Sequence, residues 1–209
     1  MSAAGYSTAT LLVAALISGC SNWTGFGFNA SSPEMPRLKE SLGLKAGMVV
    51  ADVGAGKGQL TRALAGTVGP GGRVFSTEIA QDRLKALRAM LAKAKLGNVT
   101  VVEAKARDSG LPAGCCDAIV LRRVYHHLTD PAETNASLLR ALRPGGLLAV
   151  IDFPPPFFIG RGSLGVPAQS VLGEMKASGF EMLQLRRDWP GRGPLETYCA
   201  LFRKPVPTK

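Results

Sequence analysis

The stretch 50-VADVGAGKGQLT-61 carries three glycines at alternating positions directly after an apolar run. Gly54, Gly56 and Gly58 follow a segment with the composition of a buried strand, and Asp52 precedes the first of them by two residues. A glycine-rich turn between a strand and a helix lets a nucleotide approach the backbone closely and directs the helix N-terminus toward it. This stretch therefore predicts a nucleotide-binding turn.

The glycine spacing and the nearby charges distinguish between two nucleotide classes. A dinucleotide fingerprint reads Gly-x-Gly-x-x-Gly, whereas this chain has Gly-x-Gly-x-Gly followed by Gln59. Asp52 would lie close to a bound pyrophosphate, and two like charges about 4 Å apart repel by about 4 kcal/mol at an effective dielectric constant of about 20. The pattern favours a positively charged ligand without phosphate, such as S-adenosylmethionine. Lys57 alone argues the other way, since it could reach a phosphate as well as point into solvent.

Glu78 ends the next predicted strand and follows Gly54 by 24 residues. A carboxylate at this place accepts hydrogen bonds from both ribose hydroxyls of a nucleoside. It supports nucleoside binding without choosing between the two classes, and it disfavours a 2′-phosphate.

Apolar runs and helical patterns alternate from residue 33 to the end of the chain. The predicted strands are 47–54, 73–79, 98–104, 117–123, 147–153, 181–189 and 195–204. The predicted helices are 33–42, 59–65, 80–97, 131–142 and 167–180, with Gly97 as a C-terminal cap and a turn at 143–146. This order predicts an α/β fold: a doubly wound, mostly parallel seven-stranded sheet with a C-terminal antiparallel hairpin.

Five pieces of the chain, in this order, resemble the class I S-adenosylmethionine-dependent methyltransferase family. They are 50-VADVGAGKGQLT-61, 74-VFSTEI-79, 111-LPAGCCDAIVL-121, 124-VYHHLTDP-131 and 142-LRPGGLLAVIDF-153. The resemblance covers about residues 36 to 204 and is far more specific than the glycine turn alone. It implies that S-adenosylmethionine is the cofactor.

The resemblance also implies roles for individual residues. Asp52 and the turn formed by Gly54, Ala55, Gly56 and Gly58 would hold the methionine end of the cofactor. Glu78 would bind the ribose, and Asp108 would lie near the adenine amino group. The alternative for Asp108 is a carboxylate that caps its own loop, because Lys105 and Arg107 stand where many members carry an acidic residue.

Methyl transfer from a sulfonium is an in-line displacement, in which the protein mainly supplies proximity and alignment. A general base is needed only if the acceptor must lose a proton. His126, ahead of His127, is the candidate base, with Tyr125 beside it, and the alternative is a structural role for all three. Arg122 and Arg123 fit either an anionic acceptor or a surface position.

The acceptor class has several alternatives. The leading hypothesis is a small-molecule or lipid acceptor, and a non-catalytic protein that binds S-adenosylmethionine is the second. The segment 152-DFPPPFF-158 resembles the Asp-Pro-Pro box of adenine methyltransferases, but it follows the fifth predicted strand instead of the fourth. Nucleic-acid methylation and NAD-dependent oxidoreduction therefore rank lower. Acceptor identity and oligomeric state stay open.

Residues 1–32 differ from the domain predicted at 33–209, since the first 36 residues contain no Lys or Arg. The segment 8-TATLLVAALISGC-20 is too short to span a bilayer, which takes about 20 residues. It resembles a bacterial lipoprotein signal that ends at Cys20, although the usual positive charge before the apolar core is missing. Membrane attachment through Cys20 is one expectation for localisation, and a cytoplasmic protein is the alternative.

The overall charge and the cysteines add two weaker expectations. The net charge of +10 fits an anionic partner or simply a basic domain. Cys115 and Cys116 are adjacent, so a bridge between them is not expected, and no Cys-x-x-Cys pair indicates a metal site.

Overall fold

Seven strands form one sheet in the computed structural model, which describes residues 32–155, 165–190 and 197–208. The signal-like segment with Cys20, most of the 154–167 loop and most of the 190–194 turn lie outside these residues. The strands are β1 Val49–Val53, β2 Arg73–Glu78, β3 Val99–Glu103, β4 Cys116–Arg122, β5 Leu142–Asp152, β6 Glu181–Trp189 and β7 Thr197–Arg203.

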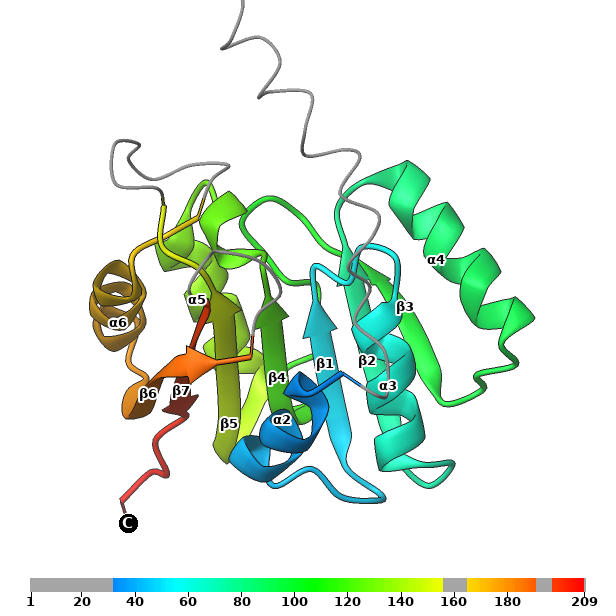
Figure 1. Ribbon diagram of the computed structural model, residues 1–209, viewed down its shortest axis with the longest axis horizontal. Coiled ribbons are helices and arrows are strands. Elements are labelled where there is room, and N and C mark those ends of the chain that lie inside the picture. Colours follow the sequence, from blue (N-terminus) through cyan, green and yellow to red (C-terminus); the bar gives the residue numbers. More distant parts are fainter. Residues whose placement is uncertain (1–31, 156–164, 191–196, 209) are drawn as a thin grey trace, which may run out of the picture.

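The strand order is β3-β2-β1-β4-β5-β7-β6 (Figure 1). All neighbouring strands run parallel except at β7, which is antiparallel to both β5 and β6. The predicted fold class is therefore confirmed. The chain crosses from β3 at one edge to β4 beside β1, so the order reverses between β1 and β4. In such sheets ligands bind at the carboxyl ends of the strands next to this reversal.

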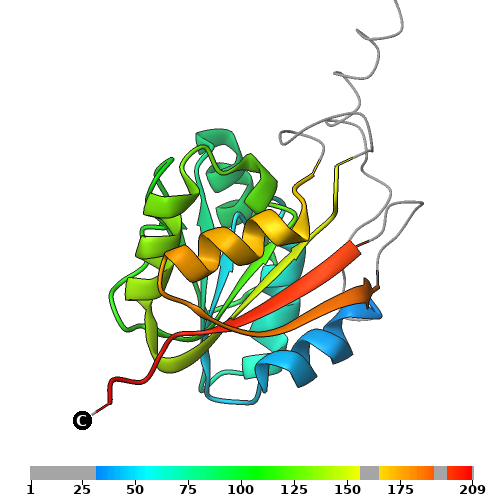
Figure 2. The same ribbon diagram turned by 90° about the vertical axis from the view of Figure 1, so that its left-hand side faces the viewer.

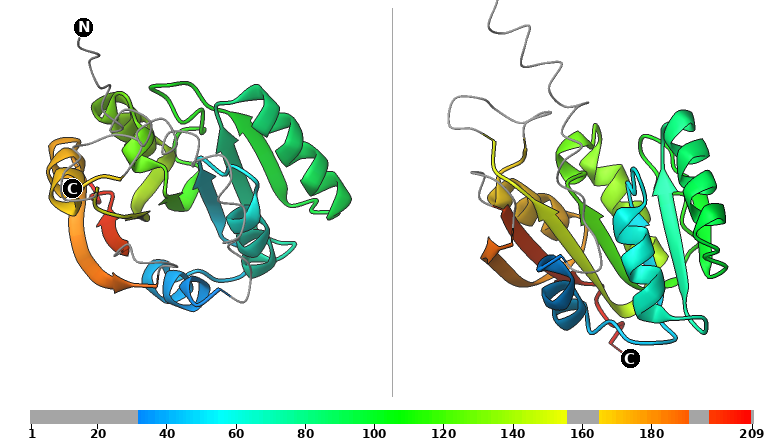
Figure 3. Two further views of the ribbon diagram at one scale, coloured as in Figure 1. Left: turned by 45° about the horizontal axis from the view of Figure 1, so that its top comes forward. Right: turned by 45° about the vertical axis from the view of Figure 1, so that its right-hand side comes forward.

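Helices cover both faces of the sheet (Figures 2 and 3). They are α2 Glu34–Leu42, α3 Gln59–Val68, α4 Gln81–Lys93, α5 Pro131–Ala141 and α6 Ala168–Ala177, with a 3-10 turn η2 at Tyr125–His127. One apolar core joins α5 and α6 to the sheet through residues such as Leu138 and Val171. The other core joins α2 and α3 to the opposite face through Leu38 and Leu64. Successive side chains along the buried strands point to opposite faces of the sheet and therefore contribute to two separate cores.

Local capping explains where α5 begins. Asp130 accepts a hydrogen bond from the Glu133 amide at 3.2 Å, and Pro131 occupies the first position of α5. The predicted cap at Gly97 is wrong. Helix α4 ends at Lys93, and the left-handed residue after it is Lys95, with φ 52°. Propensity favours glycine at such a position, but a lysine occupies it here.

The sequence 143–146 was predicted as a turn before a strand, and this is also wrong. Strand β5 begins at Leu142, which pairs with Cys116, and the register shifts before Ala118 pairs with Leu147. The amide of Gly145 donates to the Lys204 carbonyl at 2.9 Å. The Arg-Pro-Gly-Gly segment is therefore an irregular strand start tied to the end of the chain.

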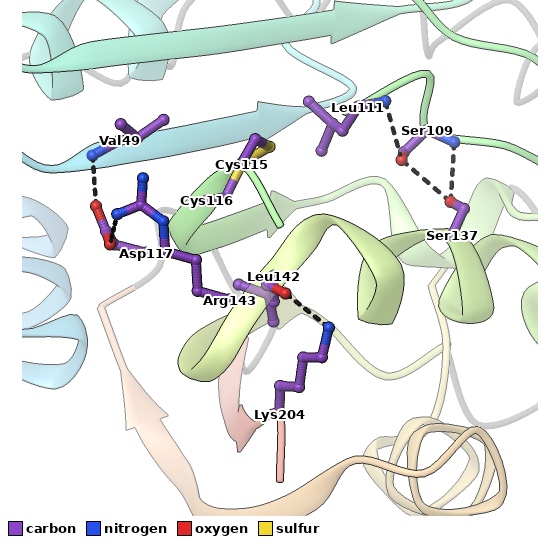
Figure 4. The surroundings of a disulfide bond; sticks show 10 residues. All are labelled: Val49, Ser109, Leu111, Cys115, Cys116, Asp117, Ser137, Leu142, Arg143 and Lys204. Carbon is purple, nitrogen blue, oxygen red and sulfur yellow. Dashed lines mark hydrogen bonds and ion pairs between the residues drawn. A yellow bond between two sulfur atoms is a disulfide. The ribbon is translucent and has the colours of Figure 1, made fainter. Parts of the chain in front are cut away.

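Cys115 and Cys116 form a disulfide, contrary to the sequence expectation (Figure 4). Their Cα atoms are 3.8 Å apart, the separation of any two consecutive residues in a trans chain. The pair lies where β4 begins, at the opposite end of the strand from the glycine turn. Next to it, Asp117 accepts a hydrogen bond from the Val49 amide at 2.7 Å and pairs with Arg143. In the part of the chain that the structure describes, no helix is long and apolar enough to cross a membrane.

Candidate functional site

The glycine turn after β1 has a backbone that side chains would disturb. Gly54, Gly56 and Gly58 have φ values of 72°, 54° and 72°, in the left-handed region that favours glycine. A Cβ on Gly54 would lie 2.1 Å from the Val124 Cγ2 atom, so this glycine is also required by close packing. The Ala55 amide donates to the Thr77 carbonyl at 2.9 Å, which fixes the turn onto β2.

Glu78 lies beside this turn at the end of β2 and is buried. Its Oε2 atom accepts a hydrogen bond from the Gly56 amide at 3.0 Å, and its Oε1 atom accepts one from the Ile79 amide at 2.9 Å. A carboxylate has about four acceptor positions, so Glu78 retains capacity for donors from a ligand. The nearest cation is Arg83, whose Nη1 atom is 3.9 Å from Oε2.

A cavity of about 310 Å³ opens between the ends of β1, β2, β3 and β4. Its walls are largely apolar, and several hydroxyl and charged groups converge on it. It is lined by Val53, Gly54, Thr77, Glu78, Ile79, Arg83, Ala104, Lys105, Ala106, Asp108, Ser109, Val124, His127, Leu128, Thr129 and Thr134. Pockets of this kind, with an apolar wall and a few polar groups, are typical of small-molecule sites.

Asp52 does not line this cavity. Its carboxylate is buried and accepts a hydrogen bond from the Thr61 hydroxyl on α3 at 2.6 Å. Burial raises the pKa of Asp52 to about 6, against the lowering effects of Thr61 and of the Arg122 charge. Asp52 therefore joins β1 to α3 below the turn.

Asp108 lines the cavity, but both of its carboxylate oxygens have partners. Oδ1 accepts from the Gly110 amide at 2.7 Å, and Oδ2 pairs with Arg140 at 3.0 Å. The loop-capping alternative thus describes its contacts, and the residue also lies at the cavity wall. One carboxylate can cap its loop and also accept from a ligand, because each oxygen has two lone pairs.

His126 and Tyr125, the predicted catalytic pair, are both buried and outside the cavity lining. His126 Nδ1 lies 2.8 and 3.0 Å from the two carboxylate oxygens of Asp152, and its amide donates to Asp152 as well. The Tyr125 hydroxyl donates to Glu174 at 3.0 Å and accepts from Asn135 at 2.8 Å. These contacts join η2 to β5, α5 and α6.

His127, ranked second in the sequence analysis, is the histidine that faces the cavity. Its ring lies 4.0 Å from the His126 ring, centroid to centroid. Burial, followed by the neighbouring His126, lowers the pKa of His127 below its ordinary value of about 6.5. This shift favours the neutral imidazole, which is the form able to accept a proton.

Arg122 forms a buried ion pair instead of facing a ligand. Its Nε and Nη2 atoms donate to the two oxygens of Glu34 at 2.8 and 2.7 Å, a bidentate arrangement. The pair joins α2 to the end of β4. Lys57 is exposed and does not line the cavity.

Ile79 and Val124 are among the cavity residues that sequence reasoning missed. Ile79 is 54% exposed although it is large and apolar, and it lies beside Glu78. Val124 fills the space that the missing side chain of Gly54 leaves. The position of Ile79, directly after a strand-ending carboxylate, can be seen in the sequence. The contact of Val124 with Gly54 depends on tertiary packing and cannot.

The lining fits an adenosine-type cofactor with a cationic amino-acid tail. Glu78 can accept from hydroxyls, and Ile79 with the alanines offers a flat apolar wall for a base. Gly54 contributes only backbone to the cavity wall, because Val124 occupies the place of its missing side chain. A phosphate beside Glu78 would face a buried carboxylate whose nearest cation is 3.9 Å away, so a dinucleotide fits less well.

Comparisons with known proteins agree with this geometry. Residues 51–150 match a family model described as a methyltransferase domain. A curated relative, the ubiquinone/menaquinone biosynthesis C-methyltransferase UbiE of Pseudomonas paraeruginosa, is 36% identical over 118 residues. That match covers 56% of this chain and 46% of the relative, so the chain matches about half the length of its curated relatives.

Two solved structures show the same fold. A SAM-dependent methyltransferase from Aquifex aeolicus gives a TM-score of 0.71 at 24% identity, covering 83% of this chain and 90% of that one. The [4+2]-cyclase SpnF gives a TM-score of 0.70 at 18% identity, covering 82% of this chain and 80% of that one. The second example shows that this fold also carries a chemistry other than methyl transfer.

Proposed function

Since the chain belongs to the class I S-adenosylmethionine-dependent methyltransferase family, we propose that it is an active enzyme that methylates a small-molecule or lipid acceptor. The observation that supports this most directly is the arrangement of Glu78 beside the glycine turn. This carboxylate is held by the Gly56 and Ile79 amides at the wall of a cavity of about 310 Å³.

In this proposal each cavity residue has a defined task toward the cofactor. Glu78 accepts hydrogen bonds from the ribose hydroxyls, and Ile79 packs against the base. The backbone at Gly54 and Gly56 allows close approach of the amino-acid tail. Asp52 acts from below, by holding α3 to β1 through Thr61. When bound, the cofactor supplies a methyl group on a sulfonium, which is an activated leaving group.

The acceptor class rests on the names of the relatives and on the shape of the site. The curated relatives are named as C-methyltransferases of ubiquinone and menaquinone biosynthesis, which favours an aromatic, lipid-like acceptor methylated at carbon. The cavity lining is mostly apolar. The protein would mainly align the acceptor for displacement and exclude water.

His127 is the base in this proposal, in place of His126. Its ring faces the cavity and its lowered pKa favours the neutral form, so its free nitrogen can take a proton from an acceptor hydroxyl or ring carbon. His126 and Asp152 fix the turn on which His127 is presented. Since the pKa of His127 is lowered, activity should hold to lower pH than for an ordinary histidine.

The primary test is calorimetric titration of the full chain with S-adenosylhomocysteine, with NADH as the control. We expect micromolar affinity for the first and none for the second. Turnover is then measured as release of S-adenosylhomocysteine from S-adenosylmethionine, with demethylated benzoquinols and naphthoquinols in detergent as acceptors. No binding of S-adenosylhomocysteine would refute the proposal.

A second candidate function is a protein that binds S-adenosylmethionine without methyl transfer. The likeness to the cyclase SpnF favours keeping it, because that protein shares the fold. Tight binding of S-adenosylhomocysteine without turnover on any acceptor of the panel would favour this candidate. Nicotinamide binding in the control would instead favour an oxidoreductase.

Attachment to a membrane through Cys20 is a separate proposal based on the sequence Leu16-Ile17-Ser18-Gly19-Cys20. In a bacterial host, the wild-type protein should fractionate with membranes and the Cys20→Ser variant should be released. A wild-type protein found in the aqueous fraction would show that the lipobox-like pattern has no function.

A further inference from the structure

Arg123 follows β4 at the carboxyl edge of the sheet and has an unusual backbone. Its φ is 57°, one of two non-glycine residues in the left-handed region among the described residues. The other, Lys95, lies in an exposed turn after α4, where left-handed residues are common. Arg123 instead lies at the end of a central strand, and its amide donates to the Ile151 carbonyl on β5 at 2.7 Å. Strained backbone of this kind often marks a functional site.

The guanidinium of Arg123 has no hydrogen-bonding partner in the part of the chain that the structure describes. Its Nε atom is buried without an acceptor, while the side chain as a whole is half-buried. Two carboxylates, Glu34 and Asp152, lie close enough to act on its charge. An arginine carries five donors, and a buried one without an acceptor costs free energy.

Both carboxylates form their hydrogen bonds with other residues and none with Arg123. Both oxygens of Glu34 accept from Arg122. Both oxygens of Asp152 are used by His126, and one also accepts from the Phe153 amide at 3.0 Å. The chain thus places the Arg123 cation near two anions that are hydrogen-bonded to other residues. Burial, followed by the Arg122 charge, lowers the pKa of Arg123, as expected where a positive charge lacks a partner.

We propose that Arg123 is a carboxylate-binding residue that recognises an anionic group of a ligand at the carboxyl edge of β4. The inference rests on the proposed function and specifies its ligands further. Val124, the next residue, lines the cavity, whereas Arg123 itself is outside that lining and its charge lies near Glu34 and Asp152. A planar guanidinium matches a carboxylate in two parallel hydrogen bonds. The carboxylate comes from the acceptor or from the amino-acid tail of the cofactor, and the experiment separates these two sources.

The variants are chosen so that folding and binding respond differently. Arg123→Gln removes the charge and keeps a polar side chain. Arg123→Gly also relieves the left-handed backbone, so its denaturation midpoint should be unchanged or higher. Arg62→Gln, an exposed position on α3, is the control with the same change in net charge. Arg123→Lys keeps the positive charge but loses the planar guanidinium that can form two parallel hydrogen bonds with a carboxylate.

The measurement is calorimetric titration of the full-length protein with two pairs of probes. Benzoate and its neutral counterpart benzamide are titrated into protein saturated with S-adenosylhomocysteine, and again into ligand-free protein. S-adenosylhomocysteine is compared with 5′-methylthioadenosine, which lacks the amino-acid tail. If the acceptor supplies the carboxylate, Arg123→Gln and Arg123→Gly lose at least ten-fold in benzoate affinity and keep their affinity for S-adenosylhomocysteine.

If the cofactor supplies the carboxylate, the same variants lose at least ten-fold for S-adenosylhomocysteine and keep their affinity for 5′-methylthioadenosine. Unchanged affinities for both carboxylate probes, or equal losses in Arg62→Gln, would overturn the inference. Failure of the wild type to bind S-adenosylhomocysteine would refute the proposed function instead. In that case the benzoate titration of the ligand-free protein still decides whether Arg123 binds a carboxylate.

Discussion

The two halves of the carboxyl edge of the sheet are built in different ways. At the ends of β1 and β2, the site consists of backbone held in glycine conformations and one carboxylate, Glu78, that accepts from backbone amides. At the ends of β4 and β5, it consists of side chains from distant elements, such as the Arg122–Glu34 pair between β4 and α2. The first half is built mainly from backbone, whereas the second half is held in place mainly by side-chain contacts between elements.

This difference predicts that stability and cofactor affinity respond to separate substitutions. The largest effect is expected for Arg122→Gln, which leaves the buried Glu34 without its hydrogen-bonded ion-pair partner. Loss of one partner of a buried pair costs about 4 kcal/mol. Chemical denaturation should show this loss, while the affinity for S-adenosylhomocysteine stays within about two-fold once the protein is folded.

A matched control is Arg37→Gln, which removes an exposed ion pair with Asp188. Exposed pairs contribute about 1 kcal/mol at most. If both variants lose the same stability, the Arg122–Glu34 pair does not differ from a surface pair, and the contrast between the two halves is wrong.

Gly54→Ala should have the next largest effect, because it joins the two halves. Its Cβ would meet Val124 Cγ2 at 2.1 Å and also suffer a left-handed φ. We expect a loss of about 3 kcal/mol in stability and no measurable cofactor binding. Gly56→Ala has the same type of φ but open space around the Cβ, so about 1 kcal/mol is expected. Adding Val124→Ala to Gly54→Ala should recover part of the stability by which Gly54→Ala falls below Gly56→Ala, because it removes the Cγ2 atom that the new Cβ meets.

Asp52 links stability to pH in the first half. Its pKa is raised from 3.8 to about 6 in the folded protein. The folded state therefore holds its proton more tightly, and stability falls by about 3 kcal/mol as the pH rises from about 4 to above 6. Asp52→Asn should remove this dependence. Unfolding free energies of both proteins between pH 4 and pH 8 measure it, and a constant difference between them would contradict the prediction.

Glu78→Gln should cause the smallest change in free energy among these variants, and the change should appear in cofactor affinity. An amide nitrogen cannot accept from a hydroxyl or a backbone amide, so affinity for S-adenosylhomocysteine should fall about ten-fold, or about 1.4 kcal/mol. Glu103→Gln, at the end of the neighbouring β3, is the control. Equal affinities of wild type and Glu78→Gln would remove Glu78 from the site.

The same contrast explains what could be read from the sequence. In the first half, the glycine spacing and the strand-ending carboxylate are local patterns that the sequence displays, but the contact of Asp52 with Thr61, away from the cavity, depends on packing. In the second half, the sequence indicated candidate residues but not which of their side chains face the cavity. These candidates were His126, Tyr125, Arg122 and Arg123. The short turn η2 places His127 outward and His126 against Asp152, and no periodicity marks a three-residue turn. Similarly, the Arg122–Glu34 pair depends on the packing of α2 against the sheet.

Errors in the fold have the same origin. Strands and helices follow apolar periodicity and were predicted with small shifts at their ends. The irregular start of β5 could not be predicted, because it depends on pairing of Leu142 with Cys116 and on contacts with Lys204. Local turn chemistry at 143–146 indicated a turn, and the pairing with β4 overrode it.

The Arg122–Glu34 pair also has a consequence for synthesis on the ribosome. The two residues are 88 positions apart, and Glu34 is made first. At roughly 5–20 residues per second, α2 waits on the order of 4 to 18 s for its partner arginine to be polymerised. During that interval the Glu34 carboxylate lacks the arginine with which it is later buried. Docking of α2 before β4 is made would therefore bury an unpaired charge. The buried ion pair of α2 therefore forms only after β4 has been synthesised.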